Sequence, residues 1–263
     1  MNKIKIVGKD IEVINDSDFL SIDINSESKF LNVISIKIKV VKDTDLIIES
    51  LTSDVKIDFC FNVLEGVSFN LFEIKNDGDY KYQYKYYLEK DSKLNIQKIN
   101  DVNKIKEMNM INLNGEKAAV NFYLKTVCKK KEKYNFLVYH NAKKTVSNIV
   151  NNGVNILDGE LEFNVSSFIP KGIKKCDASQ SNRIINLVKK KCTIKPNLFI
   201  DEEDVSAEHS AYIGNFSYDD IFYLMSRGID KSSAVNLLIK GFLMNGITFD
   251  NEFVSNMLNK YWG

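Results

Sequence analysis

The sequence has few of the residues that interrupt regular structure. Its 263 residues include two prolines and twelve glycines. This scarcity excludes a proline- or glycine-rich low-complexity protein and favours regular elements joined by turns of Asn, Asp and Lys. Hydrophobic residues make up 44% of the chain and charged residues 27%, a balance that excludes extensive disorder. A chain of this length buries a full core without disulfide bonds.

Net charge and long apolar runs are also lacking. Lys and Arg number 36 against 35 Asp and Glu, which removes the usual electrostatic argument for a nucleic-acid-binding protein. The basic runs at 129–131 and 189–191 carry no interleaved aromatic residues, so we interpret them as solvated turns. No stretch approaches the ~18 apolar residues of a membrane span, and the N-terminus lacks the apolar core of a secretory signal. We therefore expect a cytoplasmic protein that binds neither nucleic acid nor membrane.

Several catalytic and redox motifs are missing from the sequence. The four cysteines, Cys60, Cys128, Cys176 and Cys192, form no C-x-x-C pair, and we expect reduced thiols. Cys60 and Cys128 lie within apolar runs and are predicted to belong to the core. No G-x-S-x-G surrounds a serine, and there is no Walker A or G-x-G-x-x-G motif. We therefore predict that the chain is not an enzyme and not itself an ATPase.

Alternation of apolar and polar residues, typical of half-buried strands, dominates the first two hundred residues. No ten-residue helical pattern interrupts it, which argues against alternating strand and helix units. Two architectures remain possible, a sandwich or barrel and a β-solenoid. The spacing favours a solenoid, because only Gly78 and Gly115 lie in turns that resemble hairpins. The predicted strands are 33–41, 45–51, 55–63, 67–74, 80–90, 93–99, 119–127, 133–140, 148–157, 160–165, 184–188 and 197–200.

The pattern becomes helical after Gly214. Ser217 is the predicted N-cap of a helix that ends near Gly228, and Asp230 is the predicted N-cap of the next, over 230–242. A third helix is predicted over 249–262. The apolar faces expected for the three helices are Ile221, Leu224 and Met225, then Ala234, Leu237, Leu238 and Phe242, then Phe253, Met257, Leu258 and Tyr261. We divide the chain into a β core over 1–216 and a helical segment over 217–263.

Residues 194–243 resemble the core of the SufB/SufD family of iron–sulfur cluster assembly proteins. The resemblance rests on a P-x-L-x-I strand, an acidic step, a histidine-containing turn and F-Y-L-x-S-R-G. The matching residues are Pro196, Leu198, Ile200, Asp204, Val205, His209, Ala211, Gly214, Phe222, Tyr223, Leu224, Ser226, Arg227 and Gly228. Upstream, His140, Thr145, Ser147, Gly159 and the stretch 177–187 agree as well. Residues 1–110 match only in being rich in strands.

The resemblance implies a mainly β fold, a right-handed parallel β-helix with a small C-terminal helical segment. It also implies a scaffold subunit that dimerises through its β-helix and binds a SufC-like ABC-type ATPase through its C-terminal helices. Pairing with itself and pairing with a second SufB/SufD-like subunit both remain open. The implied cofactors are a transient iron–sulfur cluster, with none tightly bound, and ATP held by the partner only. The partner-binding residues it implies are Phe222, Tyr223, Leu224, Arg227, Gly228, Leu238 and Phe242.

The same resemblance implies a set of metal ligands, His209, Glu208 and Cys192. Imidazole and carboxylate are good iron ligands, although a histidine with a purely structural role is the simpler alternative for His209. Ser181 stands where SufB-like members carry a cysteine, which makes the chain SufD-like at this position. A serine holds no persulfide. His140 also matches a family position, and with Thr145 and Ser147 beside it we predict a hydrogen-bonded turn.

Two other functions remain open at this stage. The chain fits a purely structural, SufD-like partner subunit without cluster ligands. It also fits, less well, a β-helix enzyme acting on polysaccharide, for which the acidic run 201–204 is the one available cluster.

Overall fold

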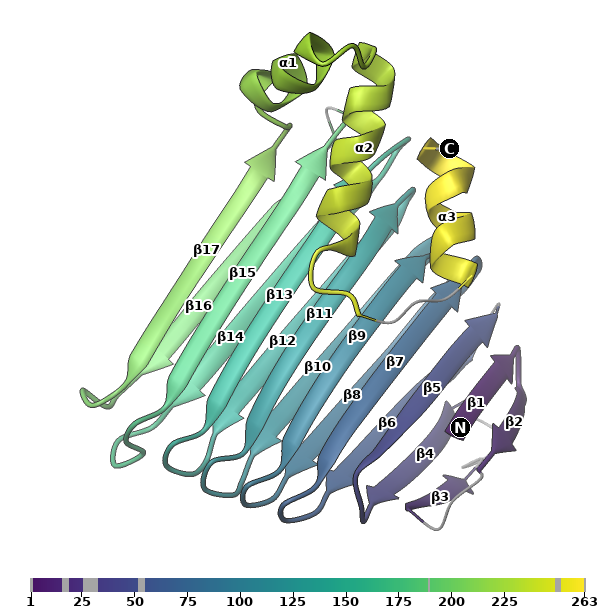
Figure 1. Ribbon diagram of the computed structural model, residues 1–263. Coiled ribbons are helices and arrows are strands. Elements are labelled where there is room, and N and C mark those ends of the chain that lie inside the picture. Colours follow the sequence, from purple (N-terminus) through teal and green to yellow (C-terminus); the bar gives the residue numbers. More distant parts are fainter. Residues whose placement is uncertain are drawn as a thin grey trace.

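The computed structural model describes residues 2–15, 19–25, 33–51, 55–188, 190–248 and 252–262. Within these ranges the chain forms two long sheets that face each other, with three helices at the C-terminal end (Figure 1). The nine strands of the first sheet are β1 (Asn2–Val7), β2 (Asp10–Ile14), β5 (Thr44–Leu51), β7 (Ser68–Asn76), β9 (Lys93–Asp101), β11 (Ala119–Cys128), β13 (Val146–Asn155), β15 (Asp177–Asn186) and β17 (Ser206–Gly214). The eight strands of the second are β3 (Leu20–Asn25), β4 (Val33–Val40), β6 (Lys56–Val63), β8 (Asp79–Leu88), β10 (Lys104–Leu113), β12 (Lys131–His140), β14 (Glu160–Ile169) and β16 (Thr193–Ile200).

From β4 onward, successive strands alternate between the two sheets. From β6 to β15, each strand pairs in parallel with the strand two before it and the strand two after it, so β9 lies between β7 and β11. This topology is a parallel β-solenoid of about seven turns, as the resemblance implied. The turns at Gly78 and Gly115 are not hairpins, because the strands on either side of each belong to different sheets.

The solenoid interior is built from the apolar half of each alternating strand. On β8, Tyr80, Tyr82, Tyr84 and Tyr86 all point inward and are buried. Stacking between neighbouring coils orders this core: the ring centroids of Phe59 and Tyr84 lie 5.1 Å apart. Each buried aromatic ring removes a large apolar area from water, and stacking adds about 0.5–1.5 kcal/mol. The alternating sequence therefore specifies both the inward faces and the register of the coils.

The outer face of the first sheet carries a ladder of amides. The Nδ2 of Asn70 donates to Asp45 (2.7 Å), Asn95 to Asn70 (2.9 Å) and Asn121 to Asn95 (3.0 Å). Each bond joins side chains in register on adjacent coils, about 4.8 Å apart. The bonds between asparagines join neutral side chains, so they stabilise stacking without like-charge repulsion.

The first and last coils end differently. At the N-terminal end β2 pairs antiparallel with β1, and β3 pairs antiparallel with β4, so antiparallel strands form the edges of both sheets there. At the other end β16 and β17 are the edge strands, and no further strand of the described chain pairs with them.

Five strands, β1, β2, β3, β10 and β17, were not predicted from the sequence. The strands β1, β2 and β3 lie before the first predicted run, and β10 was absent because Glu107 and Asn109 occupy inward positions that an apolar residue usually fills. The segment of β17 was expected to be a turn. It is a strand of small and polar residues, nearly all exposed, because no coil covers it. Its composition reflects its terminal position.

The C-terminal helices are α1 (Tyr218–Ser226), α2 (Lys231–Met244) and α3 (Glu252–Trp262). The hydroxyl of Ser217 accepts the amide proton of Asp220, and the carboxylate of Asp230 accepts those of Ser232 and Ser233, so both predicted N-caps are confirmed. Gly228 follows the first helix with φ of 87°, in the left-handed region that suits glycine. No described helix is long and apolar enough to cross a membrane.

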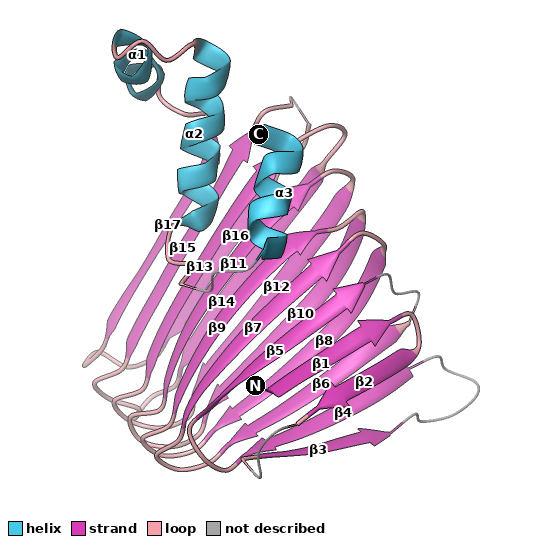
Figure 2. Cartoon of the chain, turned by 45° about the vertical axis from the view of Figure 1, so that its right-hand side comes forward, coloured by secondary structure: helices cyan, strands magenta, loops and turns pink. Residues whose placement is uncertain are grey.

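Helices α2 and α3 lie over the outer face of the first sheet, whereas α1 stands away from it (Figure 2). The buried face of α2 consists of Ala234, Ile239, Phe242 and Leu243, which corrects the predicted face: Leu237 is exposed and Leu238 half-buried. On α3, Met257, Leu258 and Trp262 are buried, and the predicted contribution of Phe253 lies outside the described side chains.

Of the two cysteines predicted to lie in the core, one does and one does not. Cys128 is buried inside the solenoid, as expected. Cys60 is not in the core: it alternates with the inward-facing Phe59 and Phe61 and lies on the outer face of the second sheet. An apolar run does not by itself decide which of its members point outward.

Candidate functional site

The terminal coil, formed by β16 and β17, is the least covered part of the solenoid. Parallel register shows which of its side chains point inward, because paired residues on adjacent strands share a face. Ala207, His209, Ala211 and Ile213 continue buried columns of β15, and Ile194, Pro196, Leu198 and Ile200 continue those of β14. The solenoid core therefore ends as an open surface of small and apolar side chains with one histidine.

His209 and Glu208 do not form a joint ligand set on their own strand. His209 pairs with the inward-facing Gln180, whereas Glu208 pairs with Ser179, whose hydroxyl donates to the Glu208 carboxylate at 3.1 Å on the outer face. Neighbouring residues of a strand point to opposite faces. The prediction of two adjacent ligands arose because this segment was taken for a turn.

Cys192 lies apart from His209. It occupies the turn between β15 and β16 and packs against the core near Leu161, Asn155 and Cys128. His209 lies in the first half of β17, a strand that reaches the same end of the solenoid as that turn only at Gly214. In the part of the chain that the structure describes, no three His, Cys, Asp or Glu residues gather as a metal site.

Ser181, which stands at the position of the family cysteine, points outward on β15. The hydroxyl of Ser210 on β17 donates to the Ser181 hydroxyl at 3.3 Å. The two serines thus join the last two coils on the outer face, on the side opposite His209. Ser181 is half-buried there, beside the terminal edge strand.

The predicted partner-binding residues separate into an exposed and a covered group. Phe222 and Tyr223 on α1 are 55% and 58% exposed, and the Arg227 guanidinium lies over the Tyr223 ring at 5.3 Å. Gly228 is exposed, and Leu224 and Leu238 are half-buried. Phe242 is buried against the solenoid, where its ring lies 5.4 Å from Arg183. Phe242 therefore attaches α2 to the sheet, and we leave it out of the docking surface.

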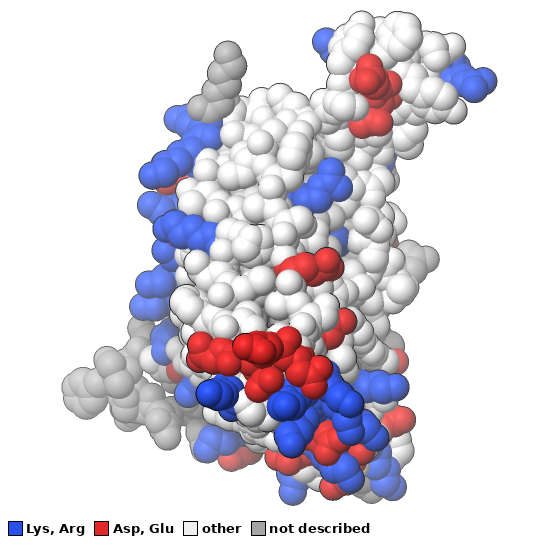
Figure 3. Space-filling view, turned by 90° about the vertical axis from the view of Figure 1, so that its left-hand side faces the viewer, with Lys and Arg blue, Asp and Glu red and all other residues white. Residues whose placement is uncertain are grey.

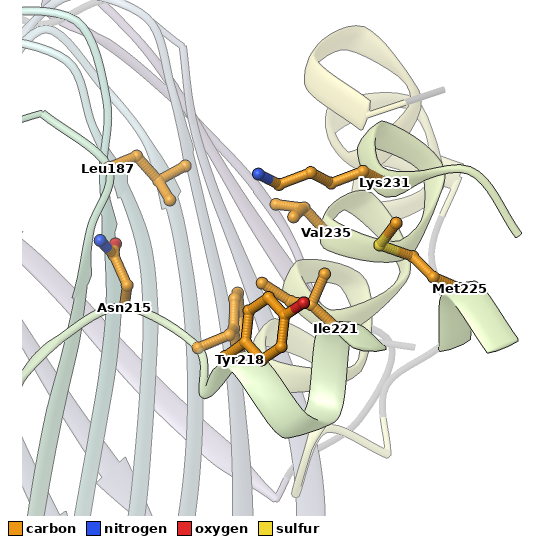
Figure 4. Close-up of a pocket in the computed structure, with 8 residues that line it drawn as sticks. Leu187, Asn215, Tyr218, Ile221, Met225, Lys231 and Val235 are labelled. Atoms are coloured by element: carbon orange, nitrogen blue, oxygen red, sulfur yellow. The ribbon is translucent and has the colours of Figure 1, made fainter. Parts of the chain in front are cut away.

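A cavity of about 530 Å³ separates α1 from the end of the solenoid (Figure 4). Its lining is mainly apolar and comes from the turn after β15, the chain before α1, and both helices: Leu187, Asn215, Phe216, Tyr218, Ile221, Met225, Lys231 and Val235. No residue of α1 is buried. This helix is held by the chain on either side of it and by α2, which leaves its aromatic face uncovered.

His140 forms the hydrogen-bonded turn that the sequence predicted. Its Nδ1 lies 2.8 Å from the Thr145 hydroxyl, and its Nε2 lies 3.0 Å from the Ser147 hydroxyl. The Thr145 hydroxyl also lies 3.2 Å from the Cys176 sulfur. Burial lowers the pKa of His140 to about 4, so the ring is neutral at physiological pH. His140 ties the end of β12 to the start of β13 inside the solenoid, and its contacts require no catalytic role.

We expect His140 to make the protein acid-labile in a defined pH window. An unfolded histidine takes up a proton near pH 6.5, while the folded one does so only near pH 4, so stability falls as pH drops from 6.5 to 4. The loss amounts to about 2–3 kcal/mol. Urea unfolding of the wild type and of His140→Gln across this range measures it. Equal pH slopes for the two proteins would contradict the assignment.

The sequence analysis missed a group of four buried charges. Lys75 lies 3.0 Å from Glu73 and 3.1 Å from Glu107; Lys98 lies 3.0 Å from Glu73 and 2.9 Å from Glu107. All four side chains are fully buried, and the Tyr84 hydroxyl donates to Glu73. Burial alone would raise the pKa of Glu107, but the two lysines outweigh it and lower that pKa to about 2. The four residues come from three strands, so no local motif announces them.

The described residues thus form a parallel β-solenoid with an open terminal coil and a C-terminal helical segment. Residues 57–242 match the family model described as SUF system FeS cluster assembly, SufBD core domain. The match covers more than half of the chain, so the chain belongs to the SufBD family of iron–sulfur cluster assembly proteins.

Individual relatives match shorter segments. The chain is 36% identical over 113 residues to the iron-sulfur cluster assembly protein SufD of Bacillus subtilis. The matched segment covers 43% of this chain and 26% of that protein. It is 32% identical over 110 residues to a SufBD family protein of Mycobacterium tuberculosis, covering 40% of this chain and 12% of the relative. A SufBD family protein of Synechocystis is 35% identical over 81 residues, covering 30% of this chain and 18% of the relative. The matched segment thus spans about a quarter or less of each relative.

Proposed function

We propose that the chain is a scaffold subunit of a SUF-type iron–sulfur cluster assembly complex. In this proposal it dimerises through the terminal coil of its β-helix and binds a SufC-like ATPase through its C-terminal helices. The open terminal coil is the observation that carries the proposal. We further propose that it works in the cytoplasm and that ATP is bound by the partner only.

The terminal coil has two features of an incomplete structure. The outer edges of β16 and β17 present backbone amides and carbonyls that pair with no described strand, and such edges readily accept a strand from another chain. The open core surface between them exposes Ile213 and leaves Leu198 only half-buried. Solenoids need a covering unit at each end. A second scaffold subunit placed edge to edge would satisfy both requirements at once.

The charge distribution also supports pairing through the terminal coil. Figure 3 looks onto the terminal coil, and its charged side chains gather at the lower end while the surface above is mostly uncharged. The lower band includes the acidic turn 201–204, which lies beside exposed Lys171, Lys174 and Lys175 of the preceding turn. A face with few charges loses little hydration on burial. In a dimer, His209 would lie at the interface, where a partner would have to supply further ligands for a transient cluster.

The helical segment supports an ATPase-binding surface. The exposed aromatic side chains of α1, Tyr218, Phe222 and Tyr223, are concentrated on one short helix that the chain's own core does not cover. Aromatic residues of this kind are typical anchors of protein interfaces. We propose that the ATPase covers this face of α1, with Leu224, Arg227, Gly228 and Leu238 next to it.

We expect the double variant Leu198→Lys with Ala211→Lys to abolish scaffold pairing, because two inward-pointing charges would be buried at the interface. Light scattering measures the mass of the chain alone and after addition of a SufB-like subunit. A wild-type mass of two chains indicates self-pairing, and a complex formed only after addition indicates pairing with the second scaffold. The control is Glu203→Lys in the exposed terminal turn, which should pair normally. A wild type that stays monomeric under both conditions would contradict the proposal.

The alternative is a purely structural, SufD-like subunit without cluster ligands. Ser181 in place of a cysteine favours it, and so does the placement of Glu208 and His209 on opposite faces of β17. Anaerobic reconstitution of the assembled complex with iron and sulfide distinguishes the two functions. A cluster that is lost in His209→Ala supports a ligand role. A cluster that survives the substitution assigns the ligands to the other subunit.

A further inference from the structure

The outer face of the second sheet carries a column of lysines. Parallel register places Lys56, Lys81, Lys106 and Lys133 at equivalent positions on β6, β8, β10 and β12. Their side chains point outward, because each alternates with buried inward neighbours. Adjacent members are therefore separated by one coil, about 4.8 Å.

Like charges directly opposite each other destabilise a sheet, so this column is not explained by the fold. At its ends, Lys56 pairs with Asp58 (2.9 Å) and Lys133 with Glu162 (3.1 Å). The two central members, Lys81 and Lys106, are exposed and make no ion pair within the described residues. The first sheet fills outward positions on the same coils with the neutral amide ladder of Asn70, Asn95 and Asn121 instead.

The column is accompanied by a shallow pocket and by flexible apolar side chains. A pocket of about 230 Å³ lies over it, lined in part by Lys56, Lys81, Lys106 and Met108. Met108, Met110 and Leu137 are half-buried on the same face. Methionine adapts to differently shaped apolar partners. Helices α2 and α3 cover the first sheet only, so this face is left open, and basic side chains protrude on its side at the left of Figure 3.

We propose that this lysine column is a docking surface for an acidic amphipathic helix of a protein partner other than the ATPase. Carboxylates at i and i+4 of a helix lie about 5–6 Å apart, close to the separation of the lysines, so a helix crossing the strands meets them one by one. Its apolar residues then contact Met108, Met110 and Leu137. If the partner bound as an extended strand, carboxylates on one of its faces would be two residues apart, at about 3.3 Å per residue. That separation matches the lysine column less well.

Nucleic acid and an anionic membrane fit the surface less well. A helix can place single carboxylates opposite Lys81 and Lys106 alone, whereas a continuous phosphate backbone would also run past the carboxylates of Asp58 and Glu162 at the ends of the column. The chain as a whole carries a net charge of +1, which gives no long-range attraction to a polyanion. Both remain outcomes of the test.

The test measures binding of a labelled helical peptide with Glu at i, i+4, i+7 and i+11 and leucines beside them, against a scrambled isomer. We expect the helical isomer to bind the full chain at least about tenfold more tightly, and Lys81→Glu with Lys106→Glu to remove about tenfold or more of that affinity. The control Lys93→Glu with Lys143→Glu makes the same charge change at exposed lysines elsewhere and should bind normally. Lys81→Gln with Lys106→Gln should weaken binding without adding charge.

Three results would overturn the proposal: equal affinity for both peptide isomers, an equal loss in the control variant, or tighter binding of duplex DNA or of phosphatidylserine vesicles than of the helical peptide. Circular dichroism of each variant establishes that it is folded. The proposed scaffold pairing and ATPase binding use other surfaces of the chain, so this result does not test them.

Discussion

Replacing Lys98 with methionine should destabilise the protein by about 3–5 kcal/mol, the range for breaking a buried ion pair from one side. The buried group of Glu73, Lys75, Lys98 and Glu107 is neutral as a whole. Removing the Lys98 amine leaves two carboxylates against one lysine and deprives Glu107 and Asn109 of a donor at 2.9 and 3.2 Å. It also removes the amine that lies 3.2 Å from the centre of the Tyr84 ring. Urea unfolding at pH 7, followed by circular dichroism, measures the change.

The double variant Lys98→Met with Glu107→Met is the matched control. It restores neutrality and leaves the pair of Lys75 and Glu73 intact, so we expect it to be much less destabilised than either single variant. A cycle in which the two single effects simply add would show that the four charges do not act as a unit. A loss below about 1 kcal/mol for Lys98→Met would show that water or relaxation compensates the remaining charge.

The strands could be predicted because the solenoid interior is mostly apolar. Runs such as those of β6, β8 and β12 alternate clearly, and their inward faces follow directly from the pattern. The alternation does not predict β10, because Glu107 and Asn109 point inward there. Their partners, Lys75 and Lys98, lie 32 and 9 residues away from Glu107 on other strands. No local window contains the information that makes those polar positions interior ones.

The length of a coil could not be predicted from a repeat in the sequence either. Equivalent asparagines are 25 residues apart between Asn70 and Asn95, 26 between Asn95 and Asn121, and 31 between Asn151 and Asn182. Turns of different lengths absorb these differences while the strands stay in register. A search for a fixed repeat therefore finds none, and the choice between solenoid and sandwich needed the family resemblance.

The candidate site residues came from the family resemblance, which gave no geometry for them. His209 does lie on the open terminal coil, and the exposed aromatic residues of α1 were correctly located in a helix. Glu208 was grouped with His209 by adjacency in the sequence, which on a strand places two side chains on opposite faces. Phe242 was assigned both to the apolar face of its helix and to the partner-binding residues, and its burial against the first sheet agrees with the first assignment.

Asp101 should be the residue on which attachment of α3 depends most. Its carboxylate accepts the Lys129 amine (2.8 Å), the Lys260 amine (3.1 Å) and the Tyr261 hydroxyl (2.8 Å), and it is almost fully buried. Asp101→Ala leaves the nearly buried Lys129 with the exposed Asp77, at 3.6 Å, and the Tyr261 hydroxyl, and it removes the contacts of Lys260 and Tyr261 with the carboxylate. We expect a loss of about 3–4 kcal/mol and release of α3 from the sheet.

The chain's one tryptophan reports this release directly. Trp262 is buried between α3 and the first sheet, so its fluorescence should shift to longer wavelength when α3 detaches. Lys260→Ala removes only the half-exposed partner of Asp101 and should cost less than about 1 kcal/mol with no spectral shift. If both variants keep the wild-type spectrum and stability, the apolar contacts of Met257, Leu258 and Trp262 hold the helix alone. In that case the polar contacts 159 and 160 residues apart in the sequence only select where it docks.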